Sequence, residues 1–144
     1  MSESSVTVTR TARILLVDAD DAATRVLAQH LRTLHPEWDV VCAESAAGAI
    51  DRLSHGPIDV LVTELDLPDM RGERLLRAVL EHHPSVVRVV LAGRPNAGLL
   101  GLSHLAHRVL RKPADDVALV PALTSALRLR REMQRASSAP RRAC

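Results

Sequence analysis

The chain has 144 residues, of which 47% are hydrophobic and 25% are charged, and its formal net charge is +2. These values are typical of one soluble globular domain, and they argue against a disordered or collagen-like chain and against a two-domain enzyme with a cleft between its domains. Trp38 is the only aromatic residue. A platform of stacked aromatic side chains for single-stranded nucleic acid is therefore excluded.

The chain carries no signal for secretion or membrane insertion. Its first residues, MSESSVTVTR, contain no apolar core of a signal peptide, and there is no run of about 18 apolar residues. The two cysteines, Cys42 and Cys144, have no metal-ligand spacing and form no convincing disulfide framework. We therefore expect a cytoplasmic protein without a membrane partner.

Short apolar runs alternate with segments of helical periodicity along the chain. Ile14 to Val17 is a continuous apolar run, which is typical of a strand buried on both faces. Asp20 or Asp21 is suited to cap the helix that follows, which should end before His35-Pro36. The same alternation predicts strands at 38–43, 58–63, 86–91 and around 109–110, and helices at 45–53, at 72–83, over a stretch containing Gly98 and Gly101, and at 116–135.

Five strand–helix pairs with short connections predict an α/β fold, a single doubly wound five-stranded parallel sheet with helices on both faces. We expect this domain over residues 12–135, between a disordered leader at 1–11 and a basic flexible tail at 136–144. Ligands of such folds bind at the carboxyl ends of the strands. No GxGxxG or GxxxxGK[ST] motif occurs, so neither a dinucleotide site nor a P-loop is indicated. The residues at the strand ends are Asp18, Glu64, Ala92 and Lys112.

Three segments at these strand ends resemble the receiver domain of bacterial response regulators, the chemotaxis-type module of two-component signalling. ILLVDADD resembles the first strand with its acidic pocket, VLVTELDLPDMRG the third strand with the phosphoacceptor loop, and LRKP the end of the fifth strand with its lysine. The resemblance covers about residues 12–131 and implies the flavodoxin-like strand order 2-1-3-4-5. It also implies Mg²⁺-assisted transfer of a phosphoryl group from a donor histidine to an aspartate, with a lysine and a hydroxyl holding the product.

Four positions depart from that family pattern. Glu64 stands where the family has the phosphoacceptor aspartate, and its extra methylene displaces the carboxylate by about 1.5 Å, enough to impair a positioned reaction. Ala19 stands at the second acidic position, so Asp18 is left as the one direct carboxylate ligand, and weak or no Mg²⁺ binding is expected. The position of the hydroxyl is Ala92, and the position of the switch aromatic is Val109.

Lys112 is the only lysine among 19 basic residues, and its compact ammonium group suits a single phosphate or carboxylate oxygen. We expect an ion pair between Lys112 and Glu64, which either mimics a partly activated state or only neutralises a vestigial pocket. Asp66 could be proposed as a substitute acceptor, but it is better interpreted as a solvated loop residue. Asp20 and Asp21 could reach back toward a metal, yet the cap and first turn of a helix explain them better.

Other candidate sites are weaker. His104 and His107 lie three residues apart on an expected helix, but two ligands are too few for a structural zinc site. No serine lies in a GxSxG motif, so a hydrolase triad is not supported. We therefore predict no catalytic residue and no cofactor, and we do not expect an enzyme.

Six arginines and a single acidic residue, Glu132, lie between Arg128 and Cys144. This end is either the solvated continuation of the last helix or a helical extension that dimerises or docks on a partner through Leu123, Leu127 and Met133. Binding of nucleic acid is the least supported option, because a run of charge alone gives only salt-sensitive, unspecific affinity.

The sequence thus predicts a pseudo-receiver, which binds other proteins of a signalling pathway, such as a histidine kinase or an output protein, independently of phosphorylation. A homodimer is compatible with this interpretation. The alternative is a functional phosphoacceptor that takes phosphate from a histidine kinase through a rearranged, Mg²⁺-dependent pocket, whereas a flavodoxin-like binder of small molecules lacks its phosphate-cradling glycines. The expected docking surface combines the helical stretch around Gly98, the last strand and the last helix, with Leu99, Leu102, Leu105 and Val120 as candidate contacts.

Overall fold

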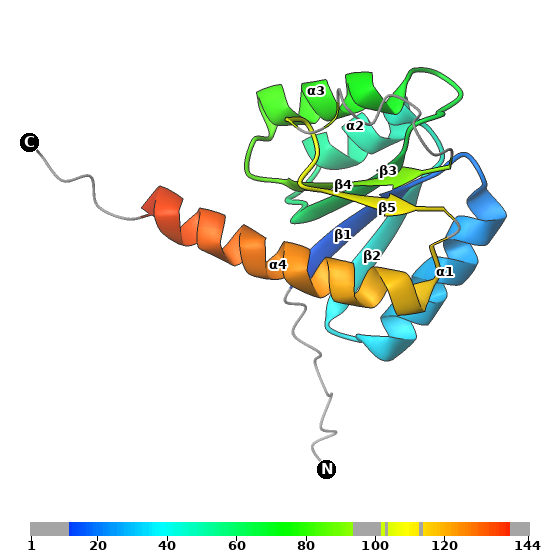
Figure 1. Ribbon diagram of the computed structural model, residues 1–144, viewed down its shortest axis with the longest axis horizontal. Helices are drawn as coiled ribbons and strands as arrows, with labels where there is room; N and C mark the ends of the chain where they lie inside the picture. Colours follow the sequence, from blue (N-terminus) through cyan, green and yellow to red (C-terminus); the bar gives the residue numbers. More distant parts are fainter. Residues whose placement is uncertain (1–11, 94–101, 103, 113, 139–144) are drawn as a thin grey trace, which may run out of the picture.

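The computed structural model describes residues 12–93, 102, 104–112 and 114–138. Strands and helices alternate as the sequence predicts as far as Ala92 (Figure 1). The stretch containing Gly98 and Gly101, where a further helix is expected, lies outside the described residues. In chain order the elements are β1 (Ala12–Val17), α1 (Asp21–Leu34), β2 (Trp38–Ala43), α2 (Ala46–Ser54), β3 (Val60–Glu64), α3 (Gly72–His82), β4 (Val87–Ala92), β5 (Arg108–Arg111) and α4 (Asp116–Ser138).

The five strands form one parallel sheet in the order β2-β1-β3-β4-β5. This order confirms the predicted flavodoxin-like topology. The register pairs Val17 with Thr63, and Ala92 with Arg111, so these strands end at one common edge. Because β3 runs through Glu64, that residue is the last of its strand and lies at the same edge.

Two apolar layers cover the sheet, one on each face. Strand residues alternate between them, which is why the strands read as continuous apolar runs. On one face Ile14, Leu16 and Val89 pack with Leu31 of α1 and Leu123 of α4. The other layer is formed by strand residues with α2, α3, Leu102 and Leu105, and it includes Leu15, Val90, Leu53, Leu75 and Val79. Figure 1 shows α2 and α3 on one side of the sheet and α1 and α4 on the other.

Two of the predicted docking residues belong to this core. Leu102 and Leu105 are each only 2% exposed and pack in the layer with α2 and α3. Val120 is half-buried against the opposite layer. The prediction that Leu102 and Leu105 form a partner surface is therefore wrong, because their side chains cover the sheet. Leu99, Gly98 and Gly101 lie outside the described residues.

Helix α4 is longer than expected and continues through Pro121 to Ser138. Leu123 and Leu127 are buried against the sheet, and Met133 is half-buried beside them. Leu123 and Leu127 therefore cannot serve as the predicted contacts for a dimer or partner, since the core already covers them, whereas Met133 is covered only in part. The last turns of α4 project past the edge of the sheet (Figure 1). Within the described residues no helix is both long and apolar enough to span a bilayer.

Candidate functional site

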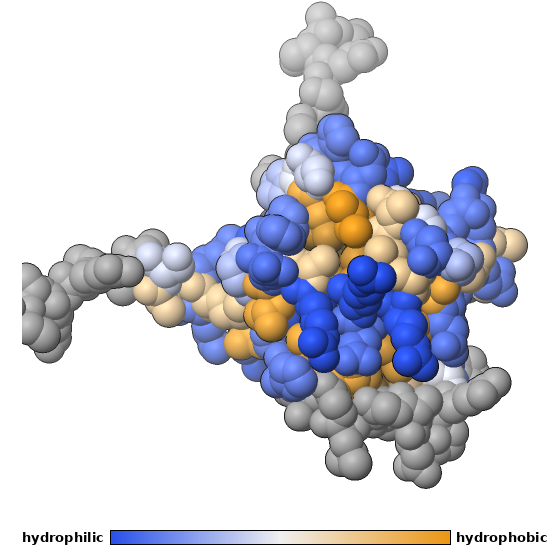
Figure 2. Space-filling model, turned by 90° about the horizontal axis from the view of Figure 1, so that it is seen from above, coloured by the Kyte–Doolittle hydropathy of each residue, from blue (hydrophilic) through white to orange (hydrophobic). Residues whose placement is uncertain are grey.

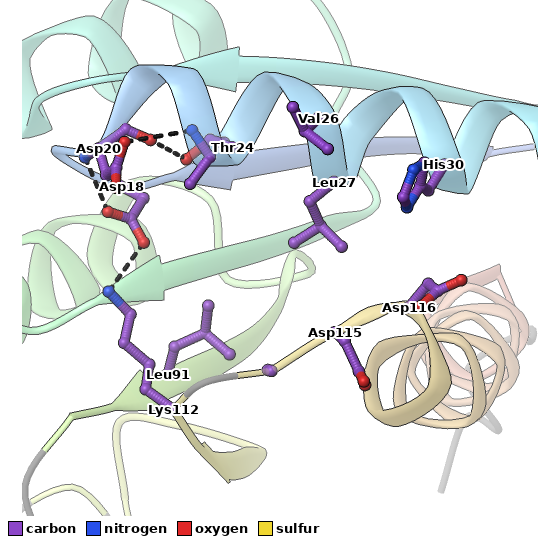
Figure 3. A pocket seen from close by; sticks show the side chains of 12 residues that line it. Asp18, Asp20, Thr24, Val26, Leu27, His30, Leu91, Lys112, Asp115 and Asp116 are labelled. Atoms are coloured by element: carbon purple, nitrogen blue, oxygen red, sulfur yellow. Dashed lines mark hydrogen bonds and ion pairs between the residues drawn. The ribbon is translucent and has the colours of Figure 1, made fainter.

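Three charged side chains meet at the carboxyl edge of the sheet. The Lys112 Nζ lies 2.8 Å from Asp18 Oδ2 and 2.7 Å from Glu64 Oε2. Asp18 directly follows β1, Glu64 ends β3 and Lys112 directly follows β5, so the parallel strands bring together residues that are far apart in sequence. The expected Glu64–Lys112 pair is present, and Asp18 joins it. Figure 3 shows the contact between Lys112 and Asp18.

The other oxygen of each carboxylate accepts a backbone hydrogen bond. The amide of Ala19 donates to Glu64 Oε1 at 2.6 Å, and the amide of Asp20 donates to Asp18 Oδ1 at 2.9 Å. All four carboxylate oxygens therefore have a donor. Glu64 is 8% exposed as a residue, so its carboxylate is held at the base of the site and not on its rim.

The Lys112 ammonium group is stabilised in its charged form. Partial burial by itself lowers its pKa, but hydrogen bonds and charge attraction from Asp18 and Glu64 outweigh burial, so the pKa is raised above its ordinary value. Two carboxylates and one ammonium group leave the cluster with one net negative charge. Lysine suits this place because a compact ammonium fits between two single oxygens.

Gly72 fixes the backbone below Glu64. A Cβ atom at Gly72 would lie 2.4 Å from the carbonyl oxygen of Glu64 and 2.8 Å from Leu65 Cα. The Gly72 amide donates to the carbonyl of Leu65 at 2.7 Å, and the Thr63 hydroxyl donates to the Glu64 carbonyl at 2.9 Å. The first residue of α3 is therefore packed directly against the end of β3, which no larger residue would permit.

Asp69 ties the loop between β3 and α3 to a neighbouring helix, a contact that the sequence analysis missed. Its Oδ1 accepts from the Ala46 amide at 2.9 Å and its Oδ2 from the Ala47 amide at 2.8 Å. These two hydrogen bonds lower the pKa of Asp69. The first free amides of α2 are thus satisfied by a residue 22 or 23 positions away. An acidic residue in a loop gives no sequence signal that distinguishes this role from solvation.

The remaining acidic candidates have structural contacts. Asp20 caps α1 by accepting from the Ala23 amide at 3.1 Å, and Asp21 pairs with Arg25 one turn later at 2.8 Å. Asp66 is exposed, and its backbone bridges to Arg71 across the loop. These positions agree with the interpretation of Asp20 and Asp21 as helix-start residues and of Asp66 as a solvated loop residue.

Of the two positions expected to lack a switching group, Ala92 contacts the cluster and Val109 lies further back on its strand. Ala92 is buried at the end of β4, and its carbonyl accepts from the Lys112 amide at 2.9 Å. Val109, at the position of the family's switch aromatic, lies on β5 and is 41% exposed. Neither side chain carries a polar group, so neither can hydrogen-bond to an anion at the cluster.

A groove of about 430 Å³ opens beside the cluster, between α1 and the start of α4. Figure 3 shows its lining, with Lys112 and Leu91 on one side and Val26, Leu27 and His30 of α1 opposite. Asp115 and Asp116 close the far end. Its floor is apolar and its rim is acidic.

The donor set at this edge consists of two carboxylates with the Lys112 ammonium group between them. A divalent cation would need carboxylate oxygens at the place where the Lys112 ammonium now lies between Asp18 and Glu64. Among residues 12–93, 102, 104–112 and 114–138, no three His, Cys, Asp or Glu side chains are grouped to share a metal ion. His104 is exposed, while the His107 ring accepts from the Arg88 amide at 2.9 Å, so the two histidines do not act as a pair.

Arg88 is a second buried cation, which the sequence analysis also missed. It is 5% exposed and is the second residue of β4. Its Nε donates to the Leu105 carbonyl at 2.7 Å, and its guanidinium also donates to the Val86 carbonyl at 3.0 Å. A single charged residue inside the apolar run VVRVVLA is the sequence signal that could have identified it.

The fold and the strand-end cluster define an α/β signalling domain of the receiver type. The model of the response regulator receiver domain family matches residues 14–124. Transcriptional regulatory protein TrcR of Mycobacterium tuberculosis is 32% identical over 126 residues, which is 85% of this chain and 48% of TrcR. The signal receiver domain of an HD domain-containing protein from Pseudomonas fluorescens Pf-5 superposes with a TM-score of 0.74 at 31% identity, covering 92% of this chain and 98% of that one.

The chain belongs to the response regulator receiver domain family of two-component signalling. It spans about half of the length of TrcR. A protein-glutamate methylesterase/protein-glutamine glutaminase of Cereibacter sphaeroides is 34% identical over 107 residues, which are 71% of this chain but 28% of that protein.

Proposed function

We propose that this receiver domain is a pseudo-receiver, which binds protein partners in two-component signalling without accepting a phosphoryl group. The observation that carries the proposal is the make-up of the strand-end cluster, in which Glu64 at the acceptor position pairs with Lys112 at 2.7 Å while positions 19 and 92 carry only alanine. In this arrangement the Glu64 carboxylate, at the phosphoacceptor position, already accepts hydrogen bonds from the Lys112 ammonium group and from the Ala19 amide.

Phosphoryl transfer requires a nucleophile with a free lone pair in line with the leaving group, and cations that neutralise the phosphoryl oxygens. Glu64 is buried with both oxygens engaged. Ala19 supplies no second carboxylate for a metal and Ala92 supplies no hydroxyl. Without the second carboxylate and the hydroxyl, the phosphoryl oxygens would be neutralised less completely, which argues against the phosphoacceptor alternative.

The ion cluster provides a constant charge in place of a switchable one. Glu64 contributes one negative charge, whereas an aspartyl phosphate would contribute about two. The cluster therefore favours one fixed conformation of the edge to which β1, β3 and β5 contribute. A domain of this kind would bind a histidine kinase or an output protein in the cytoplasm with an affinity independent of phosphate. Our proposal assigns no catalytic step to it, although one of its relatives bears the name of an esterase.

The decisive experiment is to incubate the purified chain with Mg²⁺ and acetyl phosphate or beryllofluoride, and to measure adducts by intact mass and by ¹⁹F NMR. Trp38 is unsuited as a reporter because it stacks on His35 at the opposite edge of the sheet, where β2 begins. We expect no adduct. A stoichiometric adduct on Asp18, Glu64 or Asp66 would overturn the proposal.

A restored variant provides the matched control. Glu64→Asp combined with Ala19→Asp and Ala92→Thr returns the acceptor, the second carboxylate and the hydroxyl to the positions that the family uses. We expect Mg²⁺-dependent labelling of this triple variant under conditions in which the natural chain stays unlabelled. An active receiver domain labelled in parallel shows that the donor is competent.

A further inference from the structure

A groove of about 350 Å³ lies between α2 and α3, on the side of the sheet opposite α1 and α4 (Figure 1). It is lined by Leu53 and Val79, which are buried, and by Ile50 of α2, which is 39% exposed. Figure 2, seen from the side of α2 and α3, shows apolar side chains beside a cluster of strongly hydrophilic ones. Exposed apolar surface bordered by polar side chains is typical of a place where a partner binds.

Two arginines extend the α3 wall of this groove. Four residues of α3 follow one another at intervals of three or four positions, which places their side chains in one row along the helix: Arg71, Arg74, Ala78 and His82. Ala78 and His82 line the groove. Arg71 and Arg74 are exposed and line a depression at the start of α3. The row therefore leads from the apolar groove to a basic end.

The carboxylates near this basic end are already engaged. Asp69, which lines the same depression, accepts hydrogen bonds from two amides of α2. Glu73 is paired with Arg77 at 2.9 Å. Among the described residues, Arg71 and Arg74 have no carboxylate within ion-pair distance. The positive end of the α3 helix dipole lies beside them, so this end of the row attracts negative charge.

The groove adds no opposing charge. The described residues that line it are apolar, small or histidine, with no carboxylate among them. Asp51, on the exposed side of α2, pairs with His55 at 3.3 Å, and Glu81 of α3 lines neither the groove nor the depression. An occupant can therefore bring carboxylates to the two arginines and apolar side chains to the groove without meeting a like charge in its lining.

The groove keeps its shape before any partner binds. The contacts of Asp69 fix the loop before α3 to the start of α2. Gly72, the first residue of α3, packs directly against the end of β3. Leu53 and Val79 belong to one apolar layer on the sheet. Because both helices are fixed in this way, filling the groove costs little conformational entropy.

We propose that the groove between α2 and α3 binds an acidic amphipathic segment of a partner protein. Apolar side chains of the segment contact Ile50 and Val79, and its carboxylates pair with Arg71 and Arg74. From Arg71 to His82, α3 extends about 17 Å, so a helical segment of about 11 residues matches the row. This inference rests on the proposed function in so far as the domain binds protein partners, and it names the surface and the chemistry of one of them.

The groove between α1 and α4 has the opposite character. Four aspartates line it, with Lys112 as its one lysine or arginine among the described residues. An acidic segment is therefore repelled from that groove and attracted to the basic end of α3. A basic peptide with the same apolar pattern is the matched control for this difference.

The test uses two fluorescein-labelled peptides of about 14 residues, a length that covers the whole row. Both carry leucines along one helical face, and the polar positions are glutamate in one and lysine in the other. Binding to the full chain is measured by fluorescence anisotropy at low and high salt. We expect the glutamate peptide to bind with a dissociation constant below about 1 mM and to weaken as salt rises. Amide NMR shifts should change mainly in α2 and α3.

Two substitutions test the two parts of the surface. Arg74→Glu should raise the dissociation constant of the glutamate peptide by about ten-fold or more, and Ile50→Gln by about three-fold or more. The Arg74 side chain has no hydrogen bond or ion pair within the described residues, so this variant should fold, which circular dichroism checks. Arg128→Glu makes the same change of charge at an exposed position of α4, on the other side of the sheet, and should leave the constant unchanged.

Four outcomes overturn the proposal. They are no binding of the glutamate peptide up to about 1 mM, equal binding of the lysine peptide, an unchanged constant in Arg74→Glu, and an equal loss in Arg128→Glu. A chain whose self-association, measured by sedimentation equilibrium, excludes the peptide would assign the groove to a second copy and would also overturn it. Labelling of Glu64 by a phosphodonor would overturn the pseudo-receiver proposal and not this one, so the two proposals can fail separately.

Discussion

Two buried or partly buried cations, Lys112 and Arg88, are held in opposite ways. Lys112 contacts two carboxylates, and its pKa is raised. Arg88 contacts backbone carbonyls of Leu105 and Val86, and burial lowers its pKa. Within the part of the chain that the structure describes, no carboxylate lies within ion-pair distance of Arg88. Among the described residues, the charge of Lys112 is balanced by carboxylates, and that of Arg88 is balanced only by the dipoles of carbonyl groups.

Lys112 belongs to the charged cluster at the strand ends, whereas Arg88 has a purely structural role in holding the backbone together. At Lys112 opposite charges converge from three strand ends, so removing any one member changes the net charge of the cluster. At Arg88 the guanidinium bridges the β4 backbone to the turn that precedes β5, and its several donors match several carbonyls. Replacing Lys112 by an apolar residue therefore leaves two carboxylates facing each other, whereas replacing Arg88 leaves only neutral carbonyl groups without donors.

The largest effect is expected for Lys112→Met. This change leaves Asp18 and Glu64 facing each other without a cation, which should lower the free energy of unfolding by about 2–3 kcal/mol. Urea denaturation at neutral pH measures the loss. The double variant Lys112→Met with Glu64→Gln should recover part of it, because only one carboxylate then remains. Equal stability of the natural chain and Lys112→Met would contradict the charge-compensated description.

Arg88→Met should cost less, about 1–2 kcal/mol, because it leaves carbonyls without donors but no unpaired charge. The same denaturation experiment applies. Arg88→Lys is the matched control: its ammonium keeps the charge but cannot reproduce the fork of the guanidinium, so it should not rescue the stability. A loss larger than that of Lys112→Met would reverse the ranking of the two cations.

Glu64→Gln should have a smaller effect still, about 1 kcal/mol or less. The amide oxygen can still accept from Ala19, and Lys112 keeps its contact with Asp18. Glu64→Ala, which removes both contacts, is the comparison variant and should be clearly less stable in the same urea titration. If the two variants were equally stable, the hydrogen bond from Ala19 would contribute nothing.

The smallest effect concerns His107, next to Arg88. Burial, and then the charge of Arg88, lower the pKa of His107 below its ordinary value of 6.5. The unfolded chain therefore takes up this proton first, so the stabilising contribution is present above about pH 6.5 and is lost as the pH falls below it. The slope of unfolding free energy against pH in this acidic window should decrease in His107→Gln. An unchanged slope would assign the acid sensitivity to other groups.

Much of the fold could be predicted because apolar runs and helix-start residues are local signals. Parallel strands also bring their carboxyl ends together, which is why the contact between Glu64 and Lys112 could be expected without a structure. Local signals also predicted that Asp20 starts a helix and that Asp66 is a solvated loop residue. Periodicity located the last helix but could not determine which of its two faces meets the sheet.

The missed features depend on contacts between distant segments. Leu102 and Leu105 look like exposed leucines of a weak helix, yet they cover the sheet beside Val90. In the sequence, Arg88 looks like an interruption of a strand. Its partners are backbone carbonyls, which every residue has, so no residue type identifies them. Such roles follow from where the backbone of another segment lies, which residue types alone do not encode.

The bridge from Asp69 to the start of α2 has a consequence for hydrogen exchange. The amides of Ala46 and Ala47 belong to the first turn of a helix, where protons usually exchange with solvent early because they lack intrahelical acceptors. Here a carboxylate from a loop more than 20 residues away holds both. The deuterium uptake of these two amides should therefore follow the detachment of the loop between β3 and α3. The NMR signals of Ala46 and Ala47, in α2, would thus report the motion of that loop.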